Sequence, residues 1–74
     1  MNTEKLIEEA KRLAANTPGL FQPREIMDRL YHGNPPAPLE MVAVLSGLAT
    51  ICDTNPHPGD GRWIVRASKR EAYT

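Results

Sequence analysis

The stretch TICDTNPHPGDGRWIVR, residues 50–66, decides the fold of this chain. Its two ends, Thr50–Thr54 and Arg62–Arg66, are rich in residues that favour strands, whereas the seven residues between them are mostly Pro, Gly, Asn and Asp. Two such runs around a turn-rich segment are typical of an antiparallel hairpin with a long tip. Because side chains alternate along a strand, we expect Trp63 and Val65 to face the body of the domain, and the two arginines of the second run to face water.

Upstream of this stretch, the apolar residues recur at helical spacing in three segments separated by Pro and Gly. The segments run from about Thr3 to Ala15, from Pro23 to the stop signal Gly33-Asn34, and from Leu39, after Pro38, to about Ala49. Apolar residues cover more than half of the circumference of the third segment, so we expect that helix to be buried on more than one side. The sequence therefore predicts a mainly α domain with a C-terminal β-hairpin, in the α+β class.

Length and composition allow one small domain. The chain has 74 residues, of which 41% are hydrophobic and 24% charged. It is thus too apolar for a disordered segment and too charged for a membrane span. We expect residues 1–67 to form the domain and residues 68–74 to form a polar, mobile C-terminal tail.

The order of three short helices and a hairpin resembles the winged-helix variety of helix-turn-helix domains. The stretch Gly19–Ile26 is similar to the short strand and second-helix start of that superfamily, and Met41–Ile51 looks like its third helix running into the wing. The resemblance covers roughly residues 3–67 and implies a single winged-helix-like domain. It also implies a third helix that enters the major groove of DNA and a wing that touches the backbone or the minor groove.

The basic side chains are concentrated at the C-terminal end. Residues 30–61 contain no Lys or Arg, whereas residues 62–74 contain Arg62, Arg66, Lys69 and Arg70. We expect these four cations to contact phosphates, which makes a DNA-binding, transcription-regulating protein the leading prediction. So few contacts give weak binding unless the protein forms a homodimer. In the other interpretation, the arginines lie on a solvated strand edge, where their charges prevent that edge from pairing with a sheet of another molecule.

The cation-free middle of the chain suggests a different function. Around the start of the third helix lie Tyr31, Leu39, Glu40 and Met41, which combine apolar and acidic character. Exposed methionine and leucine suit a protein partner. The alternative prediction is therefore a protein-interaction adaptor or inhibitor, of the kind found among phage or mobile-element accessory proteins.

The sequence contains no pattern typical of catalysis. It lacks a phosphate-cradling glycine loop and a nucleophile elbow, and Cys52 in a strand is usually a small hydrophobe. His57, Asp53 and Asp60 share one loop without the spacing of a metal site. We therefore expect a non-enzymatic protein without cofactor or metal.

The expected location is the cytoplasm, with no membrane partner. A single cysteine fits a reducing compartment, and Met1–Leu6 lacks the basic and apolar regions of a secretory signal.

Overall fold

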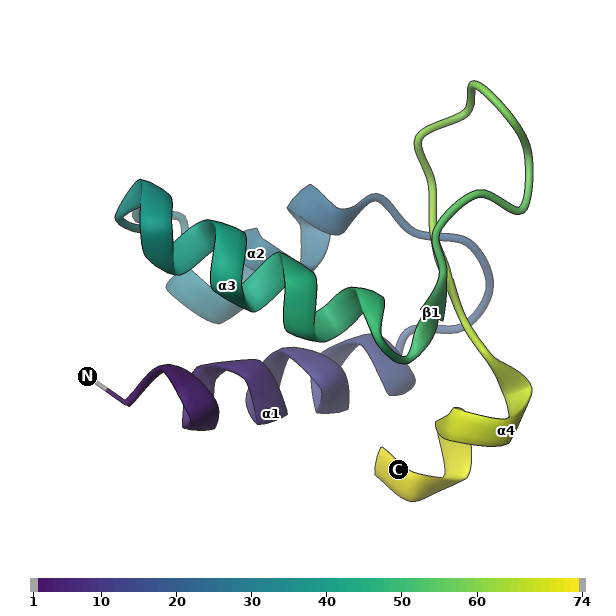
Figure 1. Cartoon of the computed structure of the whole chain (residues 1–74), viewed down its shortest axis with the longest axis horizontal. Helices are drawn as coiled ribbons and strands as arrows, with labels where there is room; N and C mark the ends of the chain where they lie inside the picture. The colour runs from purple at the N-terminus through teal and green to yellow at the C-terminus, as the bar shows by residue number, and fades with distance from the viewer. Residues whose placement is uncertain (1, 74) are drawn as a thin grey trace.

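The computed structural model describes residues 2–73. In this part of the chain, three helices precede a two-stranded antiparallel hairpin and a short C-terminal helical segment (Figure 1). The elements are α1 (Thr3–Ala15), α2 (Pro23–Tyr31), α3 (Pro38–Ala49), β1 (Cys52–Asp53), β2 (Ile64–Val65), α4 (Ala67–Arg70) and the 3₁₀ turn η1 (Glu71–Tyr73). The prediction of a mainly helical α+β domain is confirmed. None of the described helices is long and apolar enough to cross a membrane.

Local signals account for where the helices begin and end. The side chain of Asn2 accepts a hydrogen bond from the backbone N–H of Glu4 at 3.0 Å, which caps the start of α1. A proline opens both α2 and α3, where its missing N–H costs nothing. The last turn of α2 passes into two residues of left-handed conformation, His32 and Gly33, and the glycine adopts this conformation without strain.

The hairpin is shorter than the sequence predicts. Cys52 pairs with Val65 and Asp53 with Ile64, but the ladder does not extend to Thr54. Immediately after Asp53, the carboxylate of that residue accepts a hydrogen bond from the N–H of Asn55 at 3.0 Å. This side-chain turn takes the backbone out of the ladder, because it offers the chain an alternative to strand pairing.

A third backbone segment joins the hairpin. Phe21, in the link between α1 and α2, exchanges two backbone hydrogen bonds of 2.8 Å with Trp63, just before β2. Strand β2 is thus held on one side by β1 and at its start by the Phe21 link. Val65 is buried and Trp63 is partly buried against the core, as the alternation predicts.

The core is formed where α1, α2, α3 and the hairpin meet. Its buried residues include Ala10, Ala14, Phe21, Ile26, Met27, Val44, Leu48, Ile51, Cys52 and Val65. Small residues allow α1 and α3 to approach closely: a Cβ atom on Gly47 would lie 2.5 Å from Cγ2 of Ile7. The contact with α1 therefore determines which side of α3 faces inward.

The polar segment from residue 68 onward is helical over its described part. It forms most of α4 and η1, and the Tyr73 ring packs against the core. The ammonium group of Lys11 in α1 lies 5.5 Å from the centre of that ring, a cation–π contact. The expected tail thus packs on α1 over its described part, while Thr74 lies outside the described residues.

Candidate functional site

The four cations predicted to bind DNA have different surroundings in the structure. Arg62, at the exposed hairpin tip, pairs with Asp60: its Nη2 and Nε atoms lie 2.7 and 3.0 Å from the same carboxylate oxygen. Hydrogen bonding to this guanidinium lowers the pKa of Asp60, and the carboxylate in turn raises the pKa of Arg62. The charge of Arg62 is therefore compensated within the loop that carries it.

The side chain of Arg70 makes hydrogen bonds within the fold. Its Nη1 atom donates to the carbonyl oxygens of Ala15 and Thr17, at 2.6 and 3.1 Å, at the C-terminal end of α1. A cation at this end of a helix is favoured by the helix dipole, and it bonds to a carbonyl that has no partner within the helix. Arg70 thus connects the C-terminal helical segment to the α1–α2 loop.

The other terminal carbonyls of α1 are also bonded. The Arg12 oxygen accepts from the backbone and side chain of Asn16, and the Leu13 oxygen accepts from the hydroxyl of Thr17 at 2.9 Å. Arg29 of α2 donates to that same hydroxyl at 3.0 Å. Arg29 and Arg70 together therefore hold the loop after α1 from two sides.

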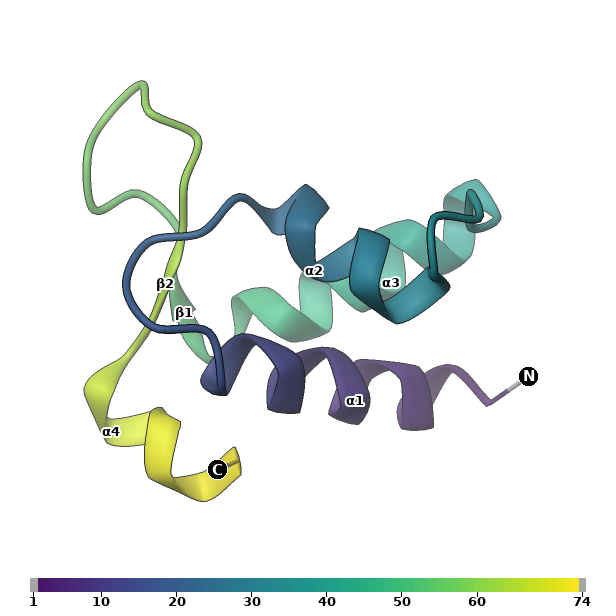
Figure 2. The same ribbon diagram turned by 180° about the vertical axis from the view of Figure 1, so that it is seen from behind.

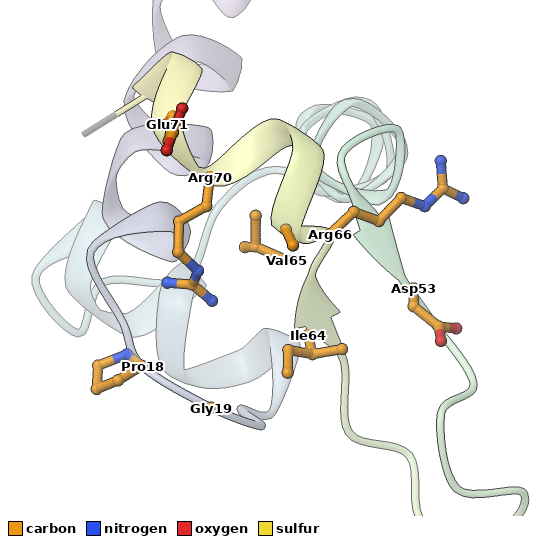
Figure 3. Close-up of a pocket in the computed structure, with 9 residues that line it drawn as sticks. Pro18, Gly19, Asp53, Ile64, Val65, Arg66, Arg70 and Glu71 are labelled. Carbon is orange, nitrogen blue, oxygen red and sulfur yellow. The ribbon is translucent and has the colours of Figure 1, made fainter.

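The other two cations predicted to bind DNA, Arg66 and Lys69, are exposed. Within residues 2–73, their side chains make no hydrogen bond of the kind that Arg62 and Arg70 make. Figure 3 shows the side chain of Arg66 extending away from that of Arg70, past Asp53. An open depression lies between the hairpin, the α1–α2 loop and α4, and its lining mixes two arginines with the carboxylates of Asp53 and Glu71. This end of the molecule therefore lacks a uniformly positive face.

A different surface is formed where α3 begins. Leu39 is 86% exposed, Val42 58% and Met41 38%, which are high values for large apolar side chains. We call this region the α3 entry surface and define it by its exposed residues Pro35, Ala37, Pro38, Leu39, Met41 and Val42. It is apolar and lies at the opposite end of the longest axis from the hairpin and α4 (Figures 1 and 2).

The expectation that α3 is buried on more than one side is wrong. Val44 and Leu48 point into the core, so Leu39 and Val42 fall on the opposite side of the helix. Helix α3 packs mainly on α1, and the hairpin continues away from it instead of folding back over it (Figure 1). The exposure of Val42 could have been predicted from the sequence, because two other short helices and a hairpin cannot cover all sides of a helix that is apolar nearly all round.

Beneath the α3 entry surface, Tyr31 and Glu40 come together. The ring of Tyr31 packs against the core, and its hydroxyl is buried without a hydrogen-bond partner at bonding distance among residues 2–73. Burial, and next the neighbouring Glu40 carboxylate, raise the pKa of this tyrosine. Of the four residues predicted for a protein contact, Leu39 and Met41 are therefore exposed, while Tyr31 and Glu40 are partly buried next to them.

Cys52 is placed as a core residue. It is a free thiol with 1% of its surface exposed. Burial raises the pKa of Cys52 to about 11, against the opposing effect of the Arg66 and Arg70 charges. At neutral pH the group is a thiol and not the nucleophilic thiolate. Within residues 2–73, no group of three or more His, Cys, Asp or Glu residues is arranged to hold a metal ion.

The raised pKa of Cys52 predicts a loss of stability at high pH. The unfolded thiol titrates near pH 8.5 and the folded one near 11, so above pH 8.5 the folded state holds more protons than the unfolded state. The free energy of unfolding then falls by up to about 1.4 kcal/mol per pH unit between these values. Urea unfolding at several pH values would measure this against Cys52→Ala, which lacks the thiol and keeps every other titratable group of the chain. Parallel pH curves for the two proteins would contradict the prediction.

A scan of protein-family models and searches of curated proteins and of solved structures found no match to this chain.

Proposed function

We propose that this protein is a small non-enzymatic interaction module on a winged-helix-like scaffold, and that it binds a partner protein through the α3 entry surface. The observation that carries the proposal is the 86% exposure of Leu39, with the exposed Val42 beside it one turn along α3. A patch of large apolar side chains at one end of a small domain is typical of a protein contact. The composition of α3 supports the proposal further, because Glu40 is the one charged residue in this helix.

The partly buried Glu40 carboxylate beside the α3 entry surface indicates the charge of the partner. Glu40 lies at the start of α3, and residues 30–61 contain no Lys or Arg. Charges across protein interfaces are arranged to be complementary, and like charges in contact are unfavourable. The partner is therefore a protein that presents an apolar site bordered by Lys or Arg.

Recognition of DNA by α3 has little support from its side chains. Bidentate contacts to guanine and adenine in the major groove are made by Arg, Lys, Asn or Gln, and none of these occurs between Pro38 and Ala49. A second candidate function, duplex DNA binding through the hairpin end, is favoured by the exposure of Arg66 and Lys69 there. With these two cations available at the described hairpin end, this binding would be weak and strongly dependent on salt.

The proposal is tested by Leu39→Asp. This change removes the most exposed apolar side chain but keeps the fold, because an acidic residue in the first turn of a helix is favoured by the helix dipole. Proteins retained by the wild-type chain and lost with Leu39→Asp are identified, and their affinities are measured with purified components. We expect Leu39→Asp to lower affinity by about 30-fold or more, the loss of a central apolar anchor. Ser46→Asp, on the same exposed side of α3 but outside the surface, is the control.

The competing function is measured in parallel. Duplex DNA is titrated with wild type and with the double variant Arg66→Ala/Lys69→Ala at about 50 mM salt, where phosphate contacts are strong. We expect no retardation of the DNA by either protein. Retardation that the double variant abolishes, together with a Leu39→Asp protein that keeps all its protein contacts, would overturn the proposal in favour of DNA binding.

A further inference from the structure

We infer that the partner's binding site is a groove lined by aromatic side chains, which takes residues 34–37 in the polyproline II conformation together with Pro38 and Leu39 in the first turn of α3. This inference rests on the proposed function and adds the chemistry of the site that is bound. It starts from the sequence Asn34-Pro35-Pro36-Ala37-Pro38, whose first four residues lie between α2 and α3 and whose last residue opens α3.

The sequence of this connection favours the polyproline II conformation, and Ala37 adopts it. Proline fixes φ near −65° and disfavours helical geometry in the residue before it, so three prolines in four positions favour an extended left-handed helix. Ala37 shows this directly, with φ −62° and ψ 142°, close to the polyproline II values of about −75° and +145°. The conformation is preformed, so little entropy is lost when a partner binds it.

The spacing and exposure of the prolines suit a groove. A polyproline II helix has three residues per turn, so Pro35 and Pro38 lie on the same edge. Both are exposed, whereas Pro36 between them is partly buried. The segment therefore rests on the domain through one edge and presents the pairs Asn34-Pro35 and Ala37-Pro38 outward. Aromatic-lined grooves recognise proline-containing pairs with this three-residue spacing.

The segment also leaves hydrogen-bond acceptors open. The N–H of Asn34 donates to Tyr31 and the carbonyl oxygen of Ala37 accepts from Met41, each at 2.9 Å. Within residues 2–73, no protein donor reaches the carbonyl oxygens of Asn34, Pro35 and Pro36. The hydroxyl of a tyrosine or the N–H of a tryptophan in a groove can donate to such carbonyls while its ring packs on the prolines.

Charge decides which grooves fit. The residues that follow Pro38 are Leu39, which is almost fully exposed, and Glu40. A groove with an acidic rim would place its carboxylates near Glu40, whereas a groove with a Lys or Arg beyond its aromatic pockets would be complementary. The inferred site therefore has aromatic pockets for the prolines, an apolar pocket for Leu39 and a basic rim.

The test is a titration of the isotope-labelled full chain with purified SH3, WW and EVH1 domains, chosen in pairs with basic and with acidic rims around the groove. We expect a basic-rimmed domain to bind with a Kd below about 1 mM, with NMR shifts centred on residues 33–42. Pro35→Ala should weaken this binding by about tenfold or more. Pro58→Ala, at an exposed proline of the hairpin tip, should leave it unchanged within about twofold.

The outcomes separate this inference from the proposed function. Absence of binding to every domain, or binding that Pro35→Ala does not weaken, overturns the aromatic groove. If a partner found through Leu39→Asp still binds Pro35→Ala with full affinity, the proposed function stands and the groove fails. A preference for acidic-rimmed domains would contradict the charge argument. In that case Glu40→Lys would strengthen binding to these domains, and the ratio of the two Kd values would measure the effect of the charge.

Discussion

Replacing Phe21 by alanine is expected to remove most of the folding stability of this domain. Phe21 is 1% exposed and is among the largest fully buried side chains. Truncating a buried phenylalanine to alanine costs about 3–5 kcal/mol, because apolar contacts are lost and a cavity remains. A domain of this length has a free energy of unfolding of roughly 4–11 kcal/mol. A chain this short buries a smaller fraction of its surface than a larger domain and falls at the lower end of that range, where Phe21→Ala leaves a protein that is marginally folded or unfolded at 25 °C.

The position of Phe21 explains why neighbouring residues cannot compensate. Its backbone is tied to Trp63 by two hydrogen bonds of 2.8 Å, so the α1–α2 link cannot move inward to fill the cavity without breaking the pairing with the hairpin. Trp63 is the chain's one tryptophan and packs against the core, so its fluorescence reports on this region during urea unfolding.

Two further variants make the measurement interpretable if Phe21→Ala does not fold. Phe21→Leu keeps most of the apolar volume and is expected to cost less than about 1.5 kcal/mol. Val42→Ala changes an exposed apolar residue and is expected to stay within about 0.5 kcal/mol of wild type. An unfolding midpoint for Phe21→Ala equal to that of wild type would show that Phe21 does not join the hairpin to the helices.

The second large effect concerns Arg70, which sequence reasoning assigned to a DNA contact. Arg70→Ala is expected to lower the free energy of unfolding by about 2 kcal/mol, because it leaves the partly buried carbonyl oxygens of Ala15 and Thr17 without their charged donor. The C-terminal helical segment also loses a direct connection to the α1–α2 loop. Urea unfolding measures the change.

The controls for Arg70 are the neighbouring cations. Arg66→Ala and Lys69→Ala are expected to change the free energy of unfolding by less than about 0.5 kcal/mol, since both side chains are exposed. Arg70→Lys should recover part of the loss, because an ammonium group keeps the charge but not the planar geometry of guanidinium. If Arg70→Ala and Arg66→Ala had equal free energies of unfolding, the hydrogen bonds of Arg70 would not stabilise the fold, and Arg70 would be available for a surface contact.

The sequence by itself determined the elements of this protein and their order. Pro23 and Pro38 mark helix starts, Gly33 marks a stop, and the change of apolar period at Thr50 marks the hairpin. Each of these signals works through residues close together in the chain. For the same reason the pairing of Asp60 with Arg62, two positions apart, was within reach of sequence reasoning.

Only the tertiary structure decided what the exposed and charged side chains do. Arg70 bonds to carbonyls more than fifty positions earlier in the chain, because the end of α1 leaves them without partners and the packing brings α4 there. Likewise, α3 could be recognised as apolar from its residues, but which of its sides stayed uncovered depended on where α1 and the hairpin came to lie. Local chemistry selects the helices and strands, whereas the contacts of a long side chain depend on which unsatisfied groups the folded chain places within its reach.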